Sequence, residues 1–353
     1  MNILGILRGF PGLGRVVSGI AILESLRDVY DYNIEIISYL QGKSFLENRG
    51  YKIPLEVTPL DYCSIGLVPT NRMGEYIHSR IKEFCPDIVL IDGEPLIVHS
   101  LRASYPKLKI VVLLNPSDID NPKNNKEAMV FFNSMYSQAD LAIVHGLREI
   151  PYNISYKSLL CTGTILRKEI FEIDNIPTNN IYCILGGGTV NVGNIFTDST
   201  LKMAKLCIES ANYLHDYYIH IVCSSKNIYD SLNHKVPENV ILYKDIIDSK
   251  EYYSKACLVI TRAGRNSLSE LAYLGIPAVS FVSGCSYRKV EQEQNLSSIS
   301  VPNICSTETC ITPLQFAVLC KSQMEKRVKS PKFIEGNQLA INKILNLCRG
   351  ILP

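Results

Sequence analysis

The sequence lacks several features that would assign it to a specialised class of protein. Tryptophan is absent, and no apolar run approaches the roughly 18 residues that a membrane-spanning helix requires. No basic leader precedes the opening apolar segment MNILGILRGF, so no secretory signal is recognised and we expect a cytoplasmic protein. The formal net charge is only +2, which gives no general electrostatic attraction to nucleic acid.

The cysteines lack the spacing of a metal or disulfide site. All 12 are scattered singly, none forms a Cys-x-x-Cys pair, and the closest two are Cys305 and Cys310. Zinc sites need close pairs, and disulfides do not persist in the intracellular setting expected here. We therefore expect small buried hydrophobic cysteines, with no metal and no cofactor.

Short apolar runs rich in Ile and Val alternate with segments of helical periodicity along the chain. Such runs are typical of strands buried on both faces of a parallel sheet. The expected strands are 2–7, 34–40, 87–92, 109–115 and 141–146 in the N-terminal half, and 181–188, 218–225, 240–244, 256–264 and 277–281 in the C-terminal half. Two such series in 353 residues predict an α/β protein with two doubly wound domains.

The domain boundaries follow from this repetition. The join falls near 159–177, so we expect an N-terminal domain over 1–163 and a C-terminal domain over 164–330. The remaining 331–353 has helical periodicity and is expected to form a helix that packs back toward the N-terminal domain.

Each half opens with a strand that runs into glycines. Gly12 and Gly14 follow the first strand, and Gly187, Gly188 and Thr189 follow the first strand of the second half. Glycines here let backbone N–H groups approach a ligand, and a helix that starts behind them favours an anion. Neither turn has the G-x-G-x-x-G or Walker spacing, so each could equally be an ordinary strand-to-helix connection.

The stretch VITRAGRNSLSELAYLGIPAVSF gathers hydrogen-bond donors at the start of an expected helix near Asn266 and Ser267. An arginine, Arg262 or Arg265, adds further donors, and a phosphate is the natural occupant of such a place. Glu270 lies on the same helix face, and its carboxylate suits two neighbouring hydroxyls. This layout predicts a nucleoside diphosphate, with the ribose one turn deeper than the diphosphate. The alternative is a capping box, in which Ser267 caps the helix and Glu270 returns the hydrogen bond.

The same stretch resembles a known family. ACLVITRAGRNSLSELAYLGIPAVSF is similar to the pattern ADLVISRAGxxTxxELxxxGxPAILxP of GT-B glycosyltransferases, above all those of the MurG type that use UDP-N-acetylglucosamine. VEQEQNLSS resembles the family's Gln-x-x-Asn signature, with Gln292 and Asn295 in those places. LCTGTILRKE resembles its GxPxRxE segment, with Arg167 at the arginine. The N-terminal glycine loop and KEFCPDIVLIDGEPL also match, so the resemblance covers most of the chain.

The resemblance implies two Rossmann-like domains that face each other across a cleft, with the donor in the C-terminal one. In that arrangement the helix at Asn266 faces the diphosphate, Glu270 binds the ribose, and the loop around Ile246 touches the base through its backbone. The other substrate-binding residues implied are Gly12, Gly14, Arg15, Arg167, Gly187, Gly188, Thr189, Arg262, Gly264, Ser267, Gln292 and Asn295. The implied reaction is an inverting, metal-independent transfer of a hexose or N-acetylhexosamine from a UDP-sugar. The acceptor is an unidentified small molecule, glycan or lipid-linked compound.

One position departs from the family pattern. Many relatives have GxGH in the N-terminal loop, whereas this chain has GLGR, with Arg15 at the histidine. Arginine stays protonated and cannot be a general base, although it could bind a phosphate or an acidic acceptor, or simply be solvated. The candidate bases are Asp92 and Glu94, which follow a strand where ligands gather in open α/β sheets. A role in an Asp-Gly turn is the alternative, and Asp118 and His99 are further candidates.

Two other functions stay open. The chain could be a nucleotide-sugar hydrolase or epimerase on the same fold, since water could replace the acceptor. It could also be a non-catalytic subunit that binds a nucleotide sugar, which Arg15 fits as well. Finally, MGEYIHSRIKEF could present Tyr76 and Ile77 to the inner face of a membrane in weak peripheral contact, although a surface helix with a buried stripe is the simpler interpretation.

Overall fold

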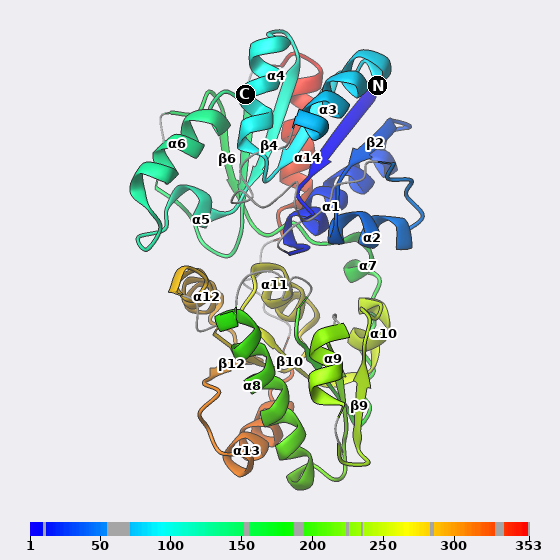
Figure 1. Ribbon diagram of the computed structural model, residues 1–353, viewed down its shortest axis with the longest axis vertical. Coiled ribbons are helices and arrows are strands. Elements are labelled where there is room, and N and C mark those ends of the chain that lie inside the picture. The colour runs from blue at the N-terminus through cyan, green and yellow to red at the C-terminus, as the bar shows by residue number, and fades with distance from the viewer. Residues whose placement is uncertain are drawn as a thin grey trace. The chain divides into compact units, whose positions relative to one another are not determined.

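The chain folds into two compact units. The computed structural model describes residues 1–9, 12–54, 71–151, 155–186, 194–223, 226–233, 236–282, 286–328 and 335–351. The first unit consists of residues 1–168 together with 334–353, and the second consists of residues 169–333 (Figure 1).

The described residues of the first unit form a parallel six-stranded sheet in the order β2-β1-β3-β4-β5-β6. The strands are β1 (Asn2–Leu7), β2 (Asn33–Ile37), β3 (Ile88–Asp92), β4 (Lys109–Leu114), β5 (Leu141–His145) and β6 (Leu159–Thr162). Ile6 pairs with Ile37 and Leu7 pairs with Asp92. The carboxyl ends of these central strands therefore meet at one edge of the sheet.

Helices cover both faces of this sheet. They are α1 (Gly14–Val29), α2 (Gln41–Asn48), α3 (Asn71–Phe84), α4 (Pro95–Ser104), α5 (Pro116–Ile119), α6 (Lys126–Tyr136) and α14 (Asn337–Cys348). Successive side chains of a strand point to opposite faces. Ile3 and Leu7 of β1 accordingly pack in one core with α1 and α14. Leu4 and Ile6 pack in the other core with α3 and α4.

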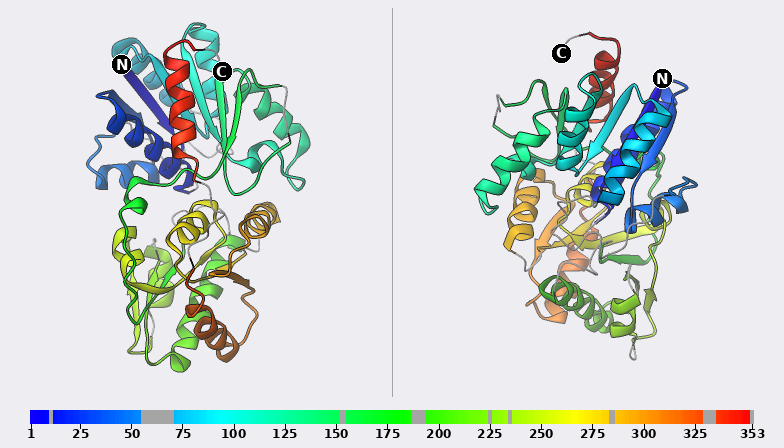
Figure 2. Two further views of the ribbon diagram at one scale, coloured as in Figure 1. Left: turned by 180° about the vertical axis from the view of Figure 1, so that it is seen from behind. Right: turned by 45° about the horizontal axis from the view of Figure 1, so that its top comes forward.

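The C-terminal helix α14 is part of the first unit. Figure 2 shows it in red against the sheet in the view from behind. Ile341 and Ile344 are buried in the core that α1 also lines. Asn337 exchanges two hydrogen bonds with the backbone of Leu166, each 2.8 Å long. These contacts join the end of the chain to the segment that follows β6.

Helix α3 contains the segment for which weak membrane contact is expected from the sequence. Ile77 and Ile81 are buried in the core, at 0% and 5% exposure, and Tyr76 packs against the same core. Ile77 is therefore not available to a membrane, because the apolar stripe of α3 covers the sheet, whereas weak peripheral membrane contact of the protein stays a prediction. In the described ranges, no helix combines the length and the apolar content needed to cross a membrane.

The second unit repeats the architecture, with the strand order β12-β11-β10-β7-β8-β9 among its described residues. Its strands are β7 (Asn180–Ile184), β8 (Tyr218–Val222), β9 (Val240–Tyr243), β10 (Ala256–Arg262), β11 (Ala278–Phe281) and β12 (Ile304–Thr307). Its helices are α7 (Lys168–Phe171), α8 (Asn194–Ser210), a 3₁₀ turn (Ala211–Tyr213), α9 (Lys226–Leu232), α10 (Ser249–Lys255), α11 (Arg265–Leu274), α12 (Ser286–Ile299) and α13 (Pro313–Met324). The predicted α/β class with two doubly wound sheets is confirmed.

The cysteines are more varied than expected. Among those described, Cys183, Cys207, Cys223 and Cys320 are buried, as predicted. The exposed ones are Cys85, Cys161 and Cys310. They lie after a helix, in an edge strand and in a turn, where little of the fold covers them. The expectation of uniformly buried cysteines is wrong at these three positions.

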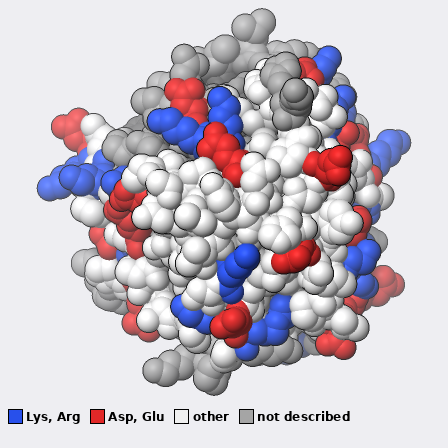
Figure 3. Space-filling view, turned by 90° about the horizontal axis from the view of Figure 1, so that it is seen from below, with Lys and Arg blue, Asp and Glu red and all other residues white. Residues whose placement is uncertain are grey.

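Charged side chains of both signs are interspersed on the face shown in Figure 3, around a broad uncharged area. This distribution agrees with the small net charge of +2.

Candidate functional site

A cluster of acidic and basic side chains occupies the carboxyl edge of the first sheet. Arg8 follows β1, Asp92 is the last residue of β3, and Asp118 lies in α5 just after β4. The backbone N–H of Arg8 donates to the carbonyl of Asp92 over 3.0 Å. Parallel strands that end together thus bring these distant residues to one place, as expected for an open α/β sheet.

Arg15, in the first turn of α1, connects two of the carboxylates. Its Nη1 donates to Asp92 Oδ1 over 2.9 Å, and its Nη2 donates to both oxygens of Asp118, over 2.7 and 2.9 Å. Burial alone would lower the pKa of Arg15, but the charges of Asp118 and Asp92 outweigh it and raise that pKa well above its ordinary value. Arg15 is therefore a permanent cation held by two anions, and it cannot act as a base.

Gly93 makes this arrangement possible. Its φ is +93°, and a Cβ added there would lie 2.4 Å from Arg15 Cδ and 2.8 Å from Arg8 Cβ. Any side chain at this position would thus meet both arginines. Asp92 and Gly93 form the turn after β3, and Asp92 also accepts a hydrogen bond from Arg15. The Asp-Gly turn and the contact with Arg15 therefore do not exclude each other.

Glu94 belongs to the same cluster. The hydroxyl of Tyr39 donates to Glu94 Oε1, and Arg8 Nε lies 3.6 Å from that oxygen. Asp92 and Glu94 are each only 1% exposed, whereas the side chain of Asp118 is 15% exposed. His99, which was a further candidate base, is exposed on α4, and its Nδ1 lies 3.1 Å from Gln138 Oε1.

Arg8 and Tyr39 were not predicted as site residues. Arg8 directly follows β1 and Tyr39 lies two residues after the end of β2, and these positions are the signal that could have identified them. Gly12 is half-buried and Gly14 begins α1, ahead of Arg15. The first glycine turn therefore leads directly into the helix that carries the central cation.

In the second unit, the connection from β10 to α11 has the expected form. Helix α11 begins at Arg265, with Gly264 as its N-cap, and no side chain caps it. The capping-box alternative is therefore wrong, because Ser267 lies inside the first turn rather than at the N-cap. Asn266 also lies in this turn, where its Oδ1 accepts a hydrogen bond from Arg265 Nε over 3.1 Å.

Glu270 stands one turn further along α11 and is 4% exposed. Its Oε2 accepts a hydrogen bond of 2.9 Å from the hydroxyl of Tyr253, a buried residue of α10. The carboxylate is thus held by a side chain of another helix.

Two predicted residues lie near the start of α11, residues 264–267, which we call the α11 tip, and each hydrogen-bonds to a neighbouring part of the second unit. Arg262, the last residue of β10, donates from Nη2 to Thr200 Oγ1 on α8. Asn295 of α12 donates from Nδ2 to the carbonyl of Ala263 over 3.2 Å. Both side chains are nearly buried, at 9% and 8% exposure. Arg262 thus contacts α8, and Asn295 contacts the residue before Gly264.

The remaining predicted residues are more dispersed. Gln292 is 7% exposed on α12, and Ile246 is 53% exposed in the loop after β9. Arg167 is 8% exposed and belongs to the first unit, since the division falls after Lys168. Gly187, Gly188 and Thr189 lie outside the described residues.

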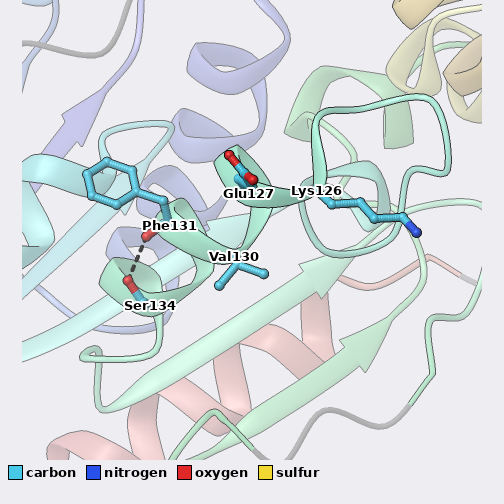
Figure 4. A pocket seen from close by; sticks show the side chains of 5 residues that line it. All are labelled: Lys126, Glu127, Val130, Phe131 and Ser134. Carbon is cyan, nitrogen blue, oxygen red and sulfur yellow. Dashed lines mark hydrogen bonds between the residues drawn. The ribbon is translucent and has the colours of Figure 1, made fainter.

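Two further features bear on what the protein could bind. Within the part of the chain that the structure describes, no group of three or more His, Cys, Asp or Glu side chains could hold a metal ion. A surface hollow of about 470 Å³ on α6 is lined by Lys126, Glu127, Val130, Phe131 and Ser134, whose side chains are labelled in Figure 4. None of these five residues belongs to the cluster around Arg15 or to the α11 tip.

Sequence comparison identifies relatives with a common activity. The family model "Glycosyltransferase family 28 C-terminal domain" matches residues 187–325. A protein of Methanosarcina mazei named "Uncharacterized glycosyltransferase" is 22% identical over 303 residues, 76% of each chain. The UDP-N-acetylglucosamine–N-acetylmuramyl-(pentapeptide) pyrophosphoryl-undecaprenol N-acetylglucosamine transferase of Rickettsia canadensis is 25% identical over 203 residues, 54% of this chain and 53% of the relative.

Solved structures share the fold along nearly the whole chain. MurG of Acinetobacter baumannii matches with a TM-score of 0.58 and 16% identity, covering 98% of this chain and 99% of its own. The UDP-GlcNAc 2-epimerase of Neisseria meningitidis, bound to UDP-GlcNAc, matches with a TM-score of 0.58 and 13% identity, covering 98% and 100%. At these identities the structural likeness shows the fold alone. The family 28 domain and the named relatives show that the chain is a glycosyltransferase, and the solved structures show that it has the GT-B fold, which it shares with MurG.

Proposed function

We propose that this glycosyltransferase moves a hexose or N-acetylhexosamine from a UDP-sugar to an acceptor hydroxyl, with inversion and without a metal ion. The observation that carries the proposal is the start of α11. Gly264 is the N-cap of this ten-residue helix, and Glu270 stands one turn behind the helix start. The N–H groups of a helix start and the helix dipole suit a diphosphate, and a carboxylate one turn deeper suits the ribose hydroxyls.

The proposed donor contacts follow the chain around this tip. Arg262, Asn266 and Ser267 contribute hydrogen-bond donors to the phosphates. As UDP leaves, the negative charge that develops on it is stabilised by fixed donors and by the helix dipole, so that a metal ion is not required. Tyr253 keeps the Glu270 carboxylate in place for the ribose.

The other donor contacts belong to the proposal as well. Gln292 and Asn295 read the donor sugar, and the hydrogen bond from Asn295 to Ala263 fixes α12 against the α11 tip. The backbone around Ile246 contacts the uracil. Gly187, Gly188, Thr189 and Arg167 contact the phosphates in this proposal.

On the acceptor side, the candidates for the general base are Asp92 and Glu94. Both lie at the carboxyl edge of the first sheet, and each is held by an arginine side chain, Arg15 or Arg8. A fixed carboxylate can accept the proton of a sugar hydroxyl that is brought within hydrogen-bond distance. Gly12 and Gly14 let the backbone of the N-terminal loop come close to the acceptor.

The donor assignment is tested by thermal shift. A ligand at 100 times its Kd stabilises the native state by about 2.7 kcal/mol, so UDP and UDP-N-acetylglucosamine should raise the Tm. Glu270→Gln should weaken UDP binding roughly 10- to 100-fold, because charged hydrogen bonds to the ribose contribute about 1.5–3 kcal/mol.

The matched control for this test is Glu238→Gln. Glu238 is exposed in the second unit, just before β9, and the substitution makes the same change of charge. It should leave UDP binding unchanged. Equal UDP affinity in the wild type and in Glu270→Gln would overturn the ribose assignment.

A second candidate function is hydrolysis or epimerisation of the nucleotide sugar. The fold is shared with a UDP-GlcNAc 2-epimerase, and Arg15 replaces the histidine of many related transferases. Incubation with UDP-N-acetylglucosamine alone separates the possibilities. Released UDP without an acceptor indicates hydrolysis, an isomerised donor indicates epimerisation, and binding without turnover indicates an accessory subunit.

A further inference from the structure

The charge at the carboxyl edge of the first sheet limits which acceptors can bind there. The cluster consists of two guanidinium groups, those of Arg8 and Arg15, and three carboxylates, those of Asp92, Glu94 and Asp118. Counted at their ordinary charges, these five described side chains carry one more negative charge than positive charges. The neighbouring ion pair, Arg148 with Asp120 at 3.1 Å, adds no net charge.

Arg15 already forms ion pairs with carboxylates of the protein. Both of its terminal nitrogens donate to carboxylates, one to Asp92 and the other to the two oxygens of Asp118. Asp118 also accepts the backbone N–H of Asn115 over 2.8 Å, so it is anchored from two sides. An anionic ligand that approached Arg15 would lie close to these two carboxylates, and this repulsion is costly where water is largely excluded.

The accessible side chains of the cluster include both donors, Arg8 and Arg15, and an acceptor, Asp118. The side chains of Arg8, Arg15 and Asp118 are 17%, 16% and 15% exposed, whereas those of Asp92 and Glu94 are almost fully buried. A hydroxyl both donates and accepts hydrogen bonds, so neighbouring hydroxyls can bind a guanidinium and a carboxylate side by side. A phosphate or carboxylate only accepts, and it would meet the excess negative charge.

We propose, on the basis of the transfer reaction proposed above, that this cluster selects an acceptor whose reacting end is an uncharged, hydroxyl-bearing sugar ring and rejects acidic ones. Arg15 taken alone would favour an acidic acceptor. Its partners Asp92 and Asp118 reverse that preference, and Asp118 is the specificity-determining residue because it is the accessible carboxylate.

The test uses two acceptors that differ only at the sugar C6, 4-nitrophenyl β-glucoside and 4-nitrophenyl β-glucuronide. Binding to the full chain in the presence of UDP is measured by saturation-transfer NMR, and transfer from UDP-N-acetylglucosamine is followed by mass spectrometry. We expect the glucoside to bind at least tenfold more tightly than the glucuronide. Equal or tighter binding of the glucuronide, or no binding of the glucoside, would overturn the proposal.

Two variants should change this ratio in opposite directions. Asp118→Asn removes the excess negative charge but keeps an oxygen for Arg15, so the preference for the glucoside should fall on the order of tenfold. Arg15→Gln removes a positive charge and should increase the preference. Asp31→Asn is the matched control, because Asp31 is exposed ahead of β2, at the opposite edge of the sheet. If Asp118→Asn shifts the ratio no more than Asp31→Asn does, Asp118 does not determine specificity.

Circular dichroism establishes whether each variant is folded. If Asp118→Asn does not fold, Arg15→Gln and the wild-type acceptor pair still decide the question. UDP binding, measured by thermal shift, reports the donor site separately. A chain that binds no UDP-sugar refutes the proposed function, whereas one that binds it and prefers the glucuronide refutes only the acceptor inference.

Discussion

The environment of Arg15 decides what this arginine can do. By itself it is a cation at the start of a helix, suited to a phosphate, an acidic acceptor or solvent. In the structure Asp92 and Asp118 neutralise it, and Gly93 leaves the space in which its side chain lies. The guanidinium therefore holds the Asp92 and Asp118 carboxylates in place at the carboxyl edge of the sheet, where the proposed reaction needs a base.

Gly93 should tolerate substitution poorly. In Gly93→Ala the Cβ would meet Arg15 Cδ at 2.4 Å, and the φ of +93° is unfavourable for alanine. We expect a loss of about 1–3 kcal/mol in the free energy of unfolding, measured by urea denaturation. The control is Gly50→Ala, since Gly50 has φ +85° with no atom within 4 Å of the added Cβ. If the two variants lose equal stability, only backbone strain matters and the contact with Arg15 does not.

His220 should make stability depend on pH. Its Nε2 donates to Asn180 Oδ1 over 2.8 Å, so its Nδ1 accepts from the hydroxyl of Tyr243 over 3.0 Å. Burial lowers the pKa of His220 below its ordinary value of 6.5. The unfolded chain therefore binds a proton more readily than the native state does, and stability falls as the pH drops below 6.5 toward the lowered pKa.

The measurement is the free energy of unfolding between pH 8 and pH 5. The decline below pH 6.5 should become smaller in His220→Gln. His215→Gln is the control, because His215 is exposed in the same unit. A pH profile unchanged by His220→Gln would show that other groups cause the decline.

At the scale of the elements, two strands were not predicted because they are short and only partly buried. β6, Leu159–Thr162, and β12, Ile304–Thr307, are four-residue edge strands with no fully buried position. They lack the apolar run that identified the central strands, so the segment of β6 was interpreted as part of the join and β12 was not predicted. The sequence predicts the start of helix α11 within one residue. Gly264 precedes this helix and Gly275 follows it, and glycines at helix ends can be recognised in a sequence.

Helix α14 offers a prediction at this scale. Ile344 is 1% exposed in the core shared with α1, whereas Leu339, on the same helix, is 51% exposed. Ile344→Ala should lower the free energy of unfolding by about 2–5 kcal/mol, because it removes buried apolar atoms and leaves a cavity. Leu339→Ala should change it by less than about 0.5 kcal/mol. Similar losses in the two variants, measured by urea denaturation, would mean that α14 is not held by this core.

At the scale of the whole molecule, the two units differ in how much the comparisons say about them. The family 28 model matches residues 187–325, which lie within the second unit, so the α11 tip falls inside a recognised glycosyltransferase domain. The cluster around Arg15 lies outside that match, in the first unit. In our proposal, acceptor preference therefore depends on contacts of this chain itself, above all those of Asp118.

The sequence by itself determined the α/β class, the two doubly wound sheets and the α11 tip, because apolar runs, glycines and helix caps are local signals. It also placed Asp92 and Glu94 at the carboxyl end of a recognisable strand, and their role as candidate bases stays a prediction. Only the tertiary structure decided the partners of these residues. The pairing of Arg15 with Asp118 and of Tyr39 with Glu94 joins positions 103 and 55 residues apart. Such contacts arise where parallel strands end together, and local sequence patterns do not report which side chains meet there.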